Sequence, residues 1–173
     1  GAVGNNLFLM GILLGGLQAY HEECGDPAVL KALKSGVQWV SRTWDAKRGG
    51  WPYAATAEGR PLYEASTGLN QLIIGPFAYL GRLEKEERLL HIAGEALTAT
   101  VCQSAGGNGK GVAQQVFFTA ATLAELQRWY AATLPDKGAN VLDGSPQRMA
   151  ELLVRTAVGD RHNARAPNRK LFF

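Results

Sequence analysis

The feature of this sequence that most constrains its fold is the repeated pairing of an apolar helical segment with an amphipathic one. Apolar residues recur at helical spacing along the chain, and no convincing run alternates apolar and polar residues as a half-buried strand does. Leu13-Leu14-Gly15 and Ile73-Ile74-Gly75 occupy equivalent places in two such pairs. The pattern predicts an all-α fold built from antiparallel helical hairpins, each with an inner and an outer helix.

Local signals place the ends of these helices. Asp26-Pro27 combines a helix-capping side chain with a proline at the first helical position. Gly75-Pro76 interrupts an apolar segment, where the proline removes one backbone donor and predicts a kink. The helices expected from these signals and from the spacing cover residues 5–22, 26–44, 68–83, 84–101, 112–132 and 145–158.

The lengths of the connections predict which loops lie together. Tight turns near residues 24–26 and 84–85 fall at one end of an up-and-down array, and the long loops 45–66 and 102–111 fall at the other. Cys24 and Cys102 therefore lie about a helix length apart at opposite ends. We expect no disulfide between them.

Composition and charge favour one folded domain. The 173 residues are 46% hydrophobic and 19% charged, which is typical of a globular chain. Residues 1–144 carry twelve Lys and Arg against thirteen Asp and Glu, whereas residues 145–173 carry six against two. We assign 1–144 to a helical-hairpin domain, and 145–173 to a C-terminal helix and basic tail of the same domain. Because the basic excess lies in a terminal extension, we expect no nucleic-acid partner.

Membrane, metal and cofactor sites are not expected. The most apolar run, residues 7–17, is shorter than the roughly 20 residues that cross a bilayer. It also lacks the preceding Lys or Arg residues of a signal peptide. His21, His91 and His162 are scattered without the spacing of metal ligands, and the glycine-rich residues 104–111 do not match a phosphate-binding loop. We expect His21 to lie at the surface, where it interacts with the end of its helix.

One short motif resembles a known architecture. "GGWPY" at residues 49–53 directly follows an outer helix and looks like the Gly-Gly-Trp-Pro element of some pectate lyases. Together with the hairpin pattern, it resembles the α/α-toroid proteins, which include many polysaccharide lyases and the six-hairpin glycosidases. The resemblance implies a partial α/α-toroid-like array and a carbohydrate-active protein, which would be periplasmic or secreted. Three hairpins do not close a six-hairpin ring, so the chain would be part of a larger protein, an open array or one partner of an oligomer.

The loop face formed by 45–66 and 102–111 is the candidate binding face. Trp51 and the two tyrosines of the loop offer flat apolar faces to sugar rings, and charged side chains among them offer hydrogen bonds or a partner for a uronate carboxylate. The alternative is that Trp51 and its neighbours close the end of the helical array. The substrate-binding candidates are Trp51, Arg60, Asp45 and Glu58, and the candidates for proton transfer, if the protein is an enzyme, are Glu64, Tyr63 and Tyr53.

Two functions therefore stay open at this point. The first is a domain that binds or processes a polysaccharide or oligosaccharide, with hydrolase or lyase chemistry if it is catalytic. The second is a non-catalytic helical-repeat module that binds a protein or completes a larger toroid, either with an additional toroid half or as a homo-oligomer. The nearly continuous apolar surface of the first helix favours the second.

Overall fold

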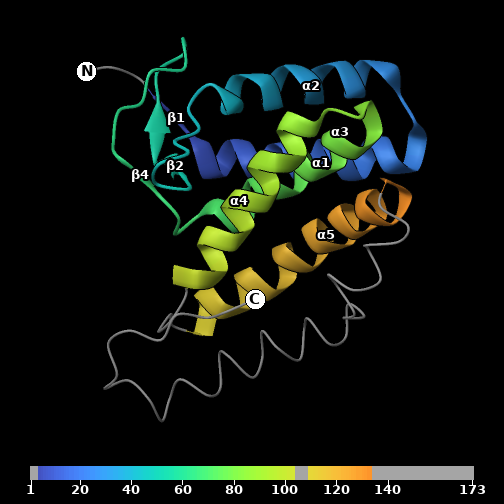
Figure 1. Ribbon diagram of the computed structural model, residues 1–173. Helices are drawn as coiled ribbons and strands as arrows, with labels where there is room; N and C mark the ends of the chain where they lie inside the picture. The colour runs from blue at the N-terminus through green and yellow to red at the C-terminus, as the bar shows by residue number, and fades with distance from the viewer. Residues whose placement is uncertain (1–3, 104–108, 134–173) are drawn as a thin grey trace.

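The computed structural model describes residues 4–103 and 109–133, and this part of the chain is mostly helical (Figure 1). Its helices are α1 (Leu7–Cys24), α2 (Pro27–Ser41), α3 (Ile74–Glu84), α4 (Glu87–Gln103) and α5 (Gly109–Thr133). Between α2 and α3 lie the strands β2 (Trp51–Pro52), β3 (Ala54–Ala55) and β4 (Ala65–Ser66) and the 3-10 turn η1 (Asn70–Leu72), and β1 (Asn5–Asn6) precedes α1. The predicted all-α class is confirmed, with a few short strands added.

Tight turns join the helices into two hairpins, α1 with α2 and α3 with α4. Gly25 ends α1 in the left-handed conformation at φ 64°, and Lys85 ends α3 at φ 57°. The Asp26 carboxylate accepts a hydrogen bond from the backbone N–H of Ala28 at 2.7 Å, so Asp26 caps α2 as predicted. α5 packs mainly against α3. The expected outer helix 145–158 lies outside the described residues.

The predicted kinked helix over 68–83 is wrong. η1 occupies the first part of this segment, and α3 begins only at Ile74. Pro76 therefore falls in the first turn of α3, where backbone N–H groups have no partner within the helix and a missing donor costs little. The sequence contains the correct signal, because proline favours a helix start as well as a kink.

The second helix also ends earlier than predicted, at Ser41 instead of about Trp44. Ser41 Oγ donates to the carbonyl of Gln38 at 2.9 Å, and Thr43 Oγ1 donates to that of Val40 at 2.8 Å. Such local side-chain bonds to the backbone compete with continued helix. Trp44 lies beyond the helix and still packs against the core.

The short strands attach the long loop to the segment before α1 and to itself. β1 pairs antiparallel with β3, with Asn5 opposite Ala55, and β2 pairs antiparallel with β4, with Trp51 opposite Ser66. Figure 1 shows β1, β2 and β4 beside one end of the α1–α2 hairpin, away from the turn that joins these helices. The loop is therefore a folded layer over the end of the bundle.

The core lies around α3, whose residues from Ile74 to Gly81 are buried with the exception of Gly75. Phe77 is its largest fully buried side chain. The first apolar helix, expected as an inner helix, is buried on one side only within the described residues. On α1, Leu9, Ile12, Leu13 and Tyr20 each expose between 48% and 58% of their surface.

Among the described residues, no helix combines the length and apolar character needed to cross a membrane. Cys24 is an exposed free thiol whose Sγ donates to the carbonyl of Tyr20 at 3.0 Å. The side chain of Cys102 lies outside the described part, so the absence of a bridge between the two stays a prediction.

Candidate functional site

The glycines of the GGWP motif allow the loop to lie directly on its neighbours. Gly49 has φ 63°, and a Cβ there would lie 2.7 Å from the Cβ of Ala99 on α4. A Cβ on Gly50 would lie 2.2 Å from the carbonyl oxygen of Ser66. Asn70 Nδ2 donates to the carbonyls of Gly49 at 2.7 Å and Ala96 at 3.2 Å, which ties the loop to α4.

Asp45, a predicted substrate-binding residue, closes this turn. Its carbonyl accepts a hydrogen bond from the N–H of Gly49 at 2.8 Å, and its carboxylate accepts one from the N–H of Arg48 at 3.1 Å. The backbone N–H of Arg48 and, to a smaller extent, its guanidinium lower the pKa of Asp45 below its usual value. The carboxylate is therefore engaged in holding the loop.

Trp51 is not a binding platform. It is 2% exposed, and its ring lies 4.6 Å from that of Trp44 and 5.3 Å from that of Phe77, measured between centroids. Gly50 permits the close pairing of β2 with β4 that directs this side chain inward. The prediction that Trp51 stacks on a sugar is wrong, and the alternative, that it closes the core, is correct.

Tyr53 and Tyr63 form an exposed aromatic pair. Their rings meet edge to face at a centroid distance of 6.0 Å, and they expose 48% and 61% of their surface. Phe8 of α1 supports Tyr53 at 5.4 Å. Glu64, the next residue along the chain, extends into solvent and pairs with Arg48 Nη2 at 3.1 Å. Two of the three proton-transfer candidates, Tyr53 and Tyr63, are thus in contact, and the third, Glu64, follows Tyr63 in the sequence.

Glu58 and Arg60 lie apart from this pair, in the turn at the tip of the loop. The N–H of Thr56 donates to the carbonyl of Arg60 at 2.9 Å, and the Arg60 N–H donates to Thr56 Oγ1 at 3.2 Å. A hydrogen bond with the side chain of Thr56 lowers the pKa of Glu58. Both side chains are exposed, and no contact among the described residues joins the Glu58 carboxylate to that of Glu64.

An open groove that sequence reasoning missed lies between this loop and α4. It has a volume of about 650 Å³ and carries three basic groups, Lys47, Arg48 and His91. His91 Nε2 lies 3.1 Å from Glu95 Oε1, and Lys47 makes no ion pair among the described residues. The remaining lining residues are Ala46, Gly49, Leu90, Gly94, Glu95, Thr98 and Ala99. Arg48 links the groove to the aromatic pair through Glu64.

The charged residues of the groove are visible in the sequence, but nothing there indicates that the two segments lie side by side. His91 and Glu95 are one helical turn apart on the polar side of an amphipathic helix, which is typical of a solvated surface. The basic residues 47 and 48 precede the glycines of the motif. The tertiary contacts of Gly49 with Ala99 and, through Asn70, with Ala96 bring these two segments together.

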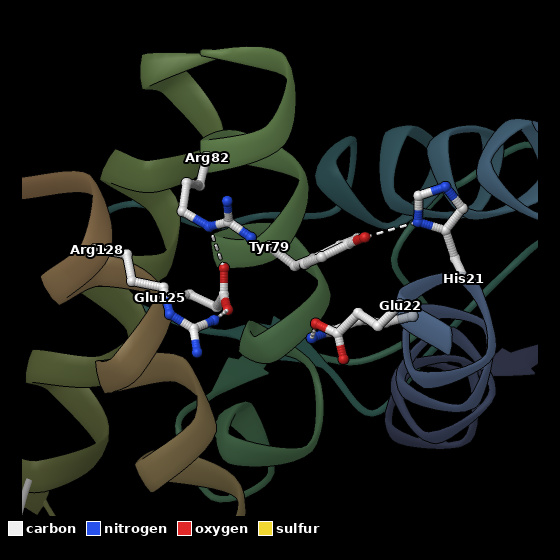
Figure 2. A network of polar contacts seen from close by, with 7 residues as sticks. His21, Glu22, Tyr79, Arg82, Glu125 and Arg128 are labelled. Atoms are coloured by element: carbon white, nitrogen blue, oxygen red, sulfur yellow. Dashed lines mark hydrogen bonds and ion pairs between the residues drawn. The ribbon is translucent and has the colours of Figure 1, made fainter. Parts of the chain in front are cut away.

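A second polar cluster joins α1, α3 and α5 near the opposite end of the bundle (Figure 2). Glu125 on α5 is buried and accepts hydrogen bonds from Arg82 of α3 and from Arg128 on its own helix. His21 Nδ1 lies 2.6 Å from the hydroxyl of Tyr79, so the imidazole contacts α3, while its expected interaction with the end of α1 stays a prediction. These contacts join α1 to α3 and α3 to α5, so we regard this helix-end cluster as structural.

The described residues contain no group of three His, Cys, Asp or Glu side chains that could hold a metal ion. Part of the loop 102–111 lies outside the described residues, so its contribution to the loop face stays a prediction. Comparisons with models of known protein families, with characterised proteins and with solved structures gave no match.

Proposed function

We propose that the loop face binds an oligosaccharide that carries carboxylate groups, such as a uronate-containing chain. The observation that carries the proposal is the groove with Lys47, Arg48 and His91, whose Arg48 pairs with Glu64, the residue after the exposed Tyr63 of the tyrosine pair. Guanidinium and ammonium groups recognise carboxylates, and aromatic faces accept the apolar faces of sugar rings. The volume of the groove lies within the range of about 300–1,000 Å³ that small-molecule sites occupy.

Arg48 is the expected anchor in place of Arg60. In the unliganded protein its guanidinium pairs with Asp45 at 3.3 Å and with Glu64 at 3.1 Å. The side chain of Glu64 is 85% exposed, so it is free to swing away and yield its place to a ligand carboxylate. Asp45 is held by the backbone and keeps the guanidinium oriented. Glu64 thus acts as a competitor for the ligand.

The proposal concerns binding and assigns no bond cleavage. Tyr53, Tyr63 and Glu64 are the proton-transfer candidates, and all three are largely exposed to solvent. General acids and bases are usually tuned by burial or by close charged neighbours, and only Glu64 has such a neighbour among the described residues. A lyase or hydrolase function would therefore need groups beyond these three.

The test is calorimetric titration of the full chain with a uronate oligosaccharide and with a neutral oligosaccharide of the same length. We expect the uronate to bind more tightly, and added salt to weaken this binding. Arg48→Ala should weaken it at least tenfold, whereas Glu64→Gln should strengthen it several-fold because the competing carboxylate is removed. Lys31→Ala, an exposed lysine on α2, is the charge-matched control and should have no effect.

Two results would count against a carboxylate-binding groove. One is equal affinity for the acidic and neutral sugars, and the other is binding of the acidic sugar that Arg48→Ala leaves unchanged. Folding of each variant is checked by thermal unfolding, because the Arg48 guanidinium also donates to the Asp45 carboxylate in this turn.

A second candidate is a non-catalytic helical-repeat module within a partial α/α-toroid-like array. It is supported by the two hairpins, whose tight turns lie at one end and whose long loop lies at the other. It is favoured further by α1, which is apolar from Leu7 to Leu17 and exposed on one side. Such a module would be completed by an additional toroid half or by another copy of the chain.

A further inference from the structure

The uncovered side of α1 is a continuous apolar stripe that the sugar-binding proposal does not use. We define the open α1 face as Leu9, Ile12, Leu13, Gly16 and Tyr20. These residues are exposed, and the last four stand three, four, seven and eleven residues after Leu9, so they lie on one side of the helix. From the helical rise, α1 is about 27 Å long. An apolar surface of this extent on a small domain marks an interaction site.

The shape of this face is complementary to itself. A Cβ on Gly16 would meet no heavy atom within 4 Å, so Gly16 is an open gap in the stripe and not a packing requirement of the monomer. Leu13 projects one turn before it. When two such helices lie antiparallel, Leu13 of one can enter the gap at Gly16 of the other, and Leu9 then lies opposite Tyr20.

The charges of α1 also favour an antiparallel partner. The helix carries Glu22 and Glu23 in its last turn and no Lys or Arg along its length. Carboxylates at a helix C-terminus are repelled by the dipole of their own helix, and they are stabilised near the N-terminus of another. Glu22 faces the bundle near Tyr79, whereas antiparallel pairing places the exposed Glu23 carboxylate beside the N-terminal end of the partner helix.

We propose that this protein forms a two-fold symmetric homodimer in which the open α1 faces of two copies pack antiparallel. A two-fold interface brings the same surface of both subunits together, which is what a self-complementary stripe requires. Because the contact involves one helix of each subunit, we expect an interface below the standard size of about 800 Å² per partner and dissociation in the micromolar range. The proposal is independent of the sugar-binding function.

The first experiment is analytical ultracentrifugation of the full chain over a concentration series that spans the micromolar range. We expect a monomer–dimer equilibrium. Gly16→Leu should shift the equilibrium to monomer at least tenfold, because it fills the gap without touching anything in its own subunit. Leu13→Asp should do the same by placing a charge in the interface. Phe117→Asp, an exposed apolar residue on α5, is the control and should leave dimerisation unchanged.

The second experiment tests the orientation of the helices. Antiparallel packing brings residue 5 of one subunit near Cys24 of the other, and both residues are exposed. With the substitution Asn5→Cys, a short thiol-to-thiol crosslinker should join the new thiol to Cys24 of the partner subunit, as mapped by mass spectrometry. Crosslinks between the two Cys24 thiols would indicate parallel helices and overturn the proposal.

Two further results would overturn it. A monomer at every concentration would mean that this face is covered by another partner or by another segment of the chain. Association that neither Gly16→Leu nor Leu13→Asp weakens would assign the dimer to a different surface. Circular dichroism and thermal unfolding of both variants establish that a monomeric result comes from the interface and not from unfolding.

Discussion

The residues of the GGWP motif serve packing more than recognition. Gly49 and Gly50 let the loop lie against Ala99 and Ser66, and Trp51 enters the core between Trp44 and Phe77. A tryptophan that follows two glycines in a long loop has the same appearance in sequence whether it faces solvent or the core. Its burial assigns the motif to stability, and the proposed binding function therefore rests on the tyrosines and the basic groove.

Gly50→Ala should destabilise the protein, because its methyl group would overlap the carbonyl oxygen of Ser66, 2.2 Å from the position of the added Cβ. We expect a loss of about 1–3 kcal/mol in the free energy of unfolding, typical of overpacking. Gly68→Ala is the matched control, since a Cβ there meets nothing within 4 Å. Denaturant unfolding measures both, and equal stabilities of the two variants would contradict this account.

The raised pKa of Tyr79 predicts that the protein loses stability at alkaline pH. Burial first, and then the nearby Glu22 carboxylate, raise its pKa above the ordinary value of 10.0; the Glu125 carboxylate acts in the same direction and the Arg82 guanidinium against it. Because the folded-state pKa lies above that of the unfolded chain, the folded protein retains this proton longer. The contribution to stability is complete below about pH 10 and is lost as pH rises through the folded-state pKa.

Tyr79→Phe should therefore unfold with a weaker pH dependence than the parent chain above about pH 10. At neutral pH it should lose about 1 kcal/mol with the hydrogen bond to His21. Tyr20→Phe, which removes an exposed hydroxyl from the same end of α1, is the control. Identical pH profiles for Tyr79→Phe and the parent chain would rule out this role for Tyr79.

At the level of elements, the two hairpins and α5 are held in place by different contacts. α1 with α2 and α3 with α4 are joined by short turns and share apolar faces, which local sequence signals describe well. α5 has no such neighbour among the described residues, and it is attached to α3 by apolar packing and by the buried Glu125, which Arg82 and Arg128 surround (Figure 2). The spacing of apolar residues within single helices does not predict an ion pair between two of them.

Glu125→Gln should loosen the attachment of α5. The carboxylate is buried, so loss of its charge leaves two guanidinium groups without a counter-charge and should cost about 2 kcal/mol. Glu84→Gln is the same change in an exposed pair with Lys34 at 2.7 Å, and it should cost at most about 1 kcal/mol. Chemical denaturation of both variants tests the difference, and a larger loss for Glu84→Gln would contradict it.

At the scale of the whole molecule, the candidate site combines segments that the sequence keeps far apart. Residues 46–49 and α4 form the groove, and Arg48 extends it toward Glu64 and the tyrosine pair. Asp45, Tyr53, Tyr63 and Glu64 were identified from their loop, although Asp45 proved to close a turn. Lys47, Arg48 and His91 were missed, because each looks like an ordinary surface charge until Gly49 brings the loop onto α4.

The sequence by itself determined the helical class, the two hairpins, their tight turns and the position of the long loop. These follow from apolar spacing, capping residues and proline, which act within a few residues of one another. Only the tertiary structure decided that Trp51 faces the core, that a basic groove opens beside it and that one side of α1 stays uncovered. Each of these depends on contacts between distant segments, and the free energy of burial is set by the packing partner and not by the local pattern.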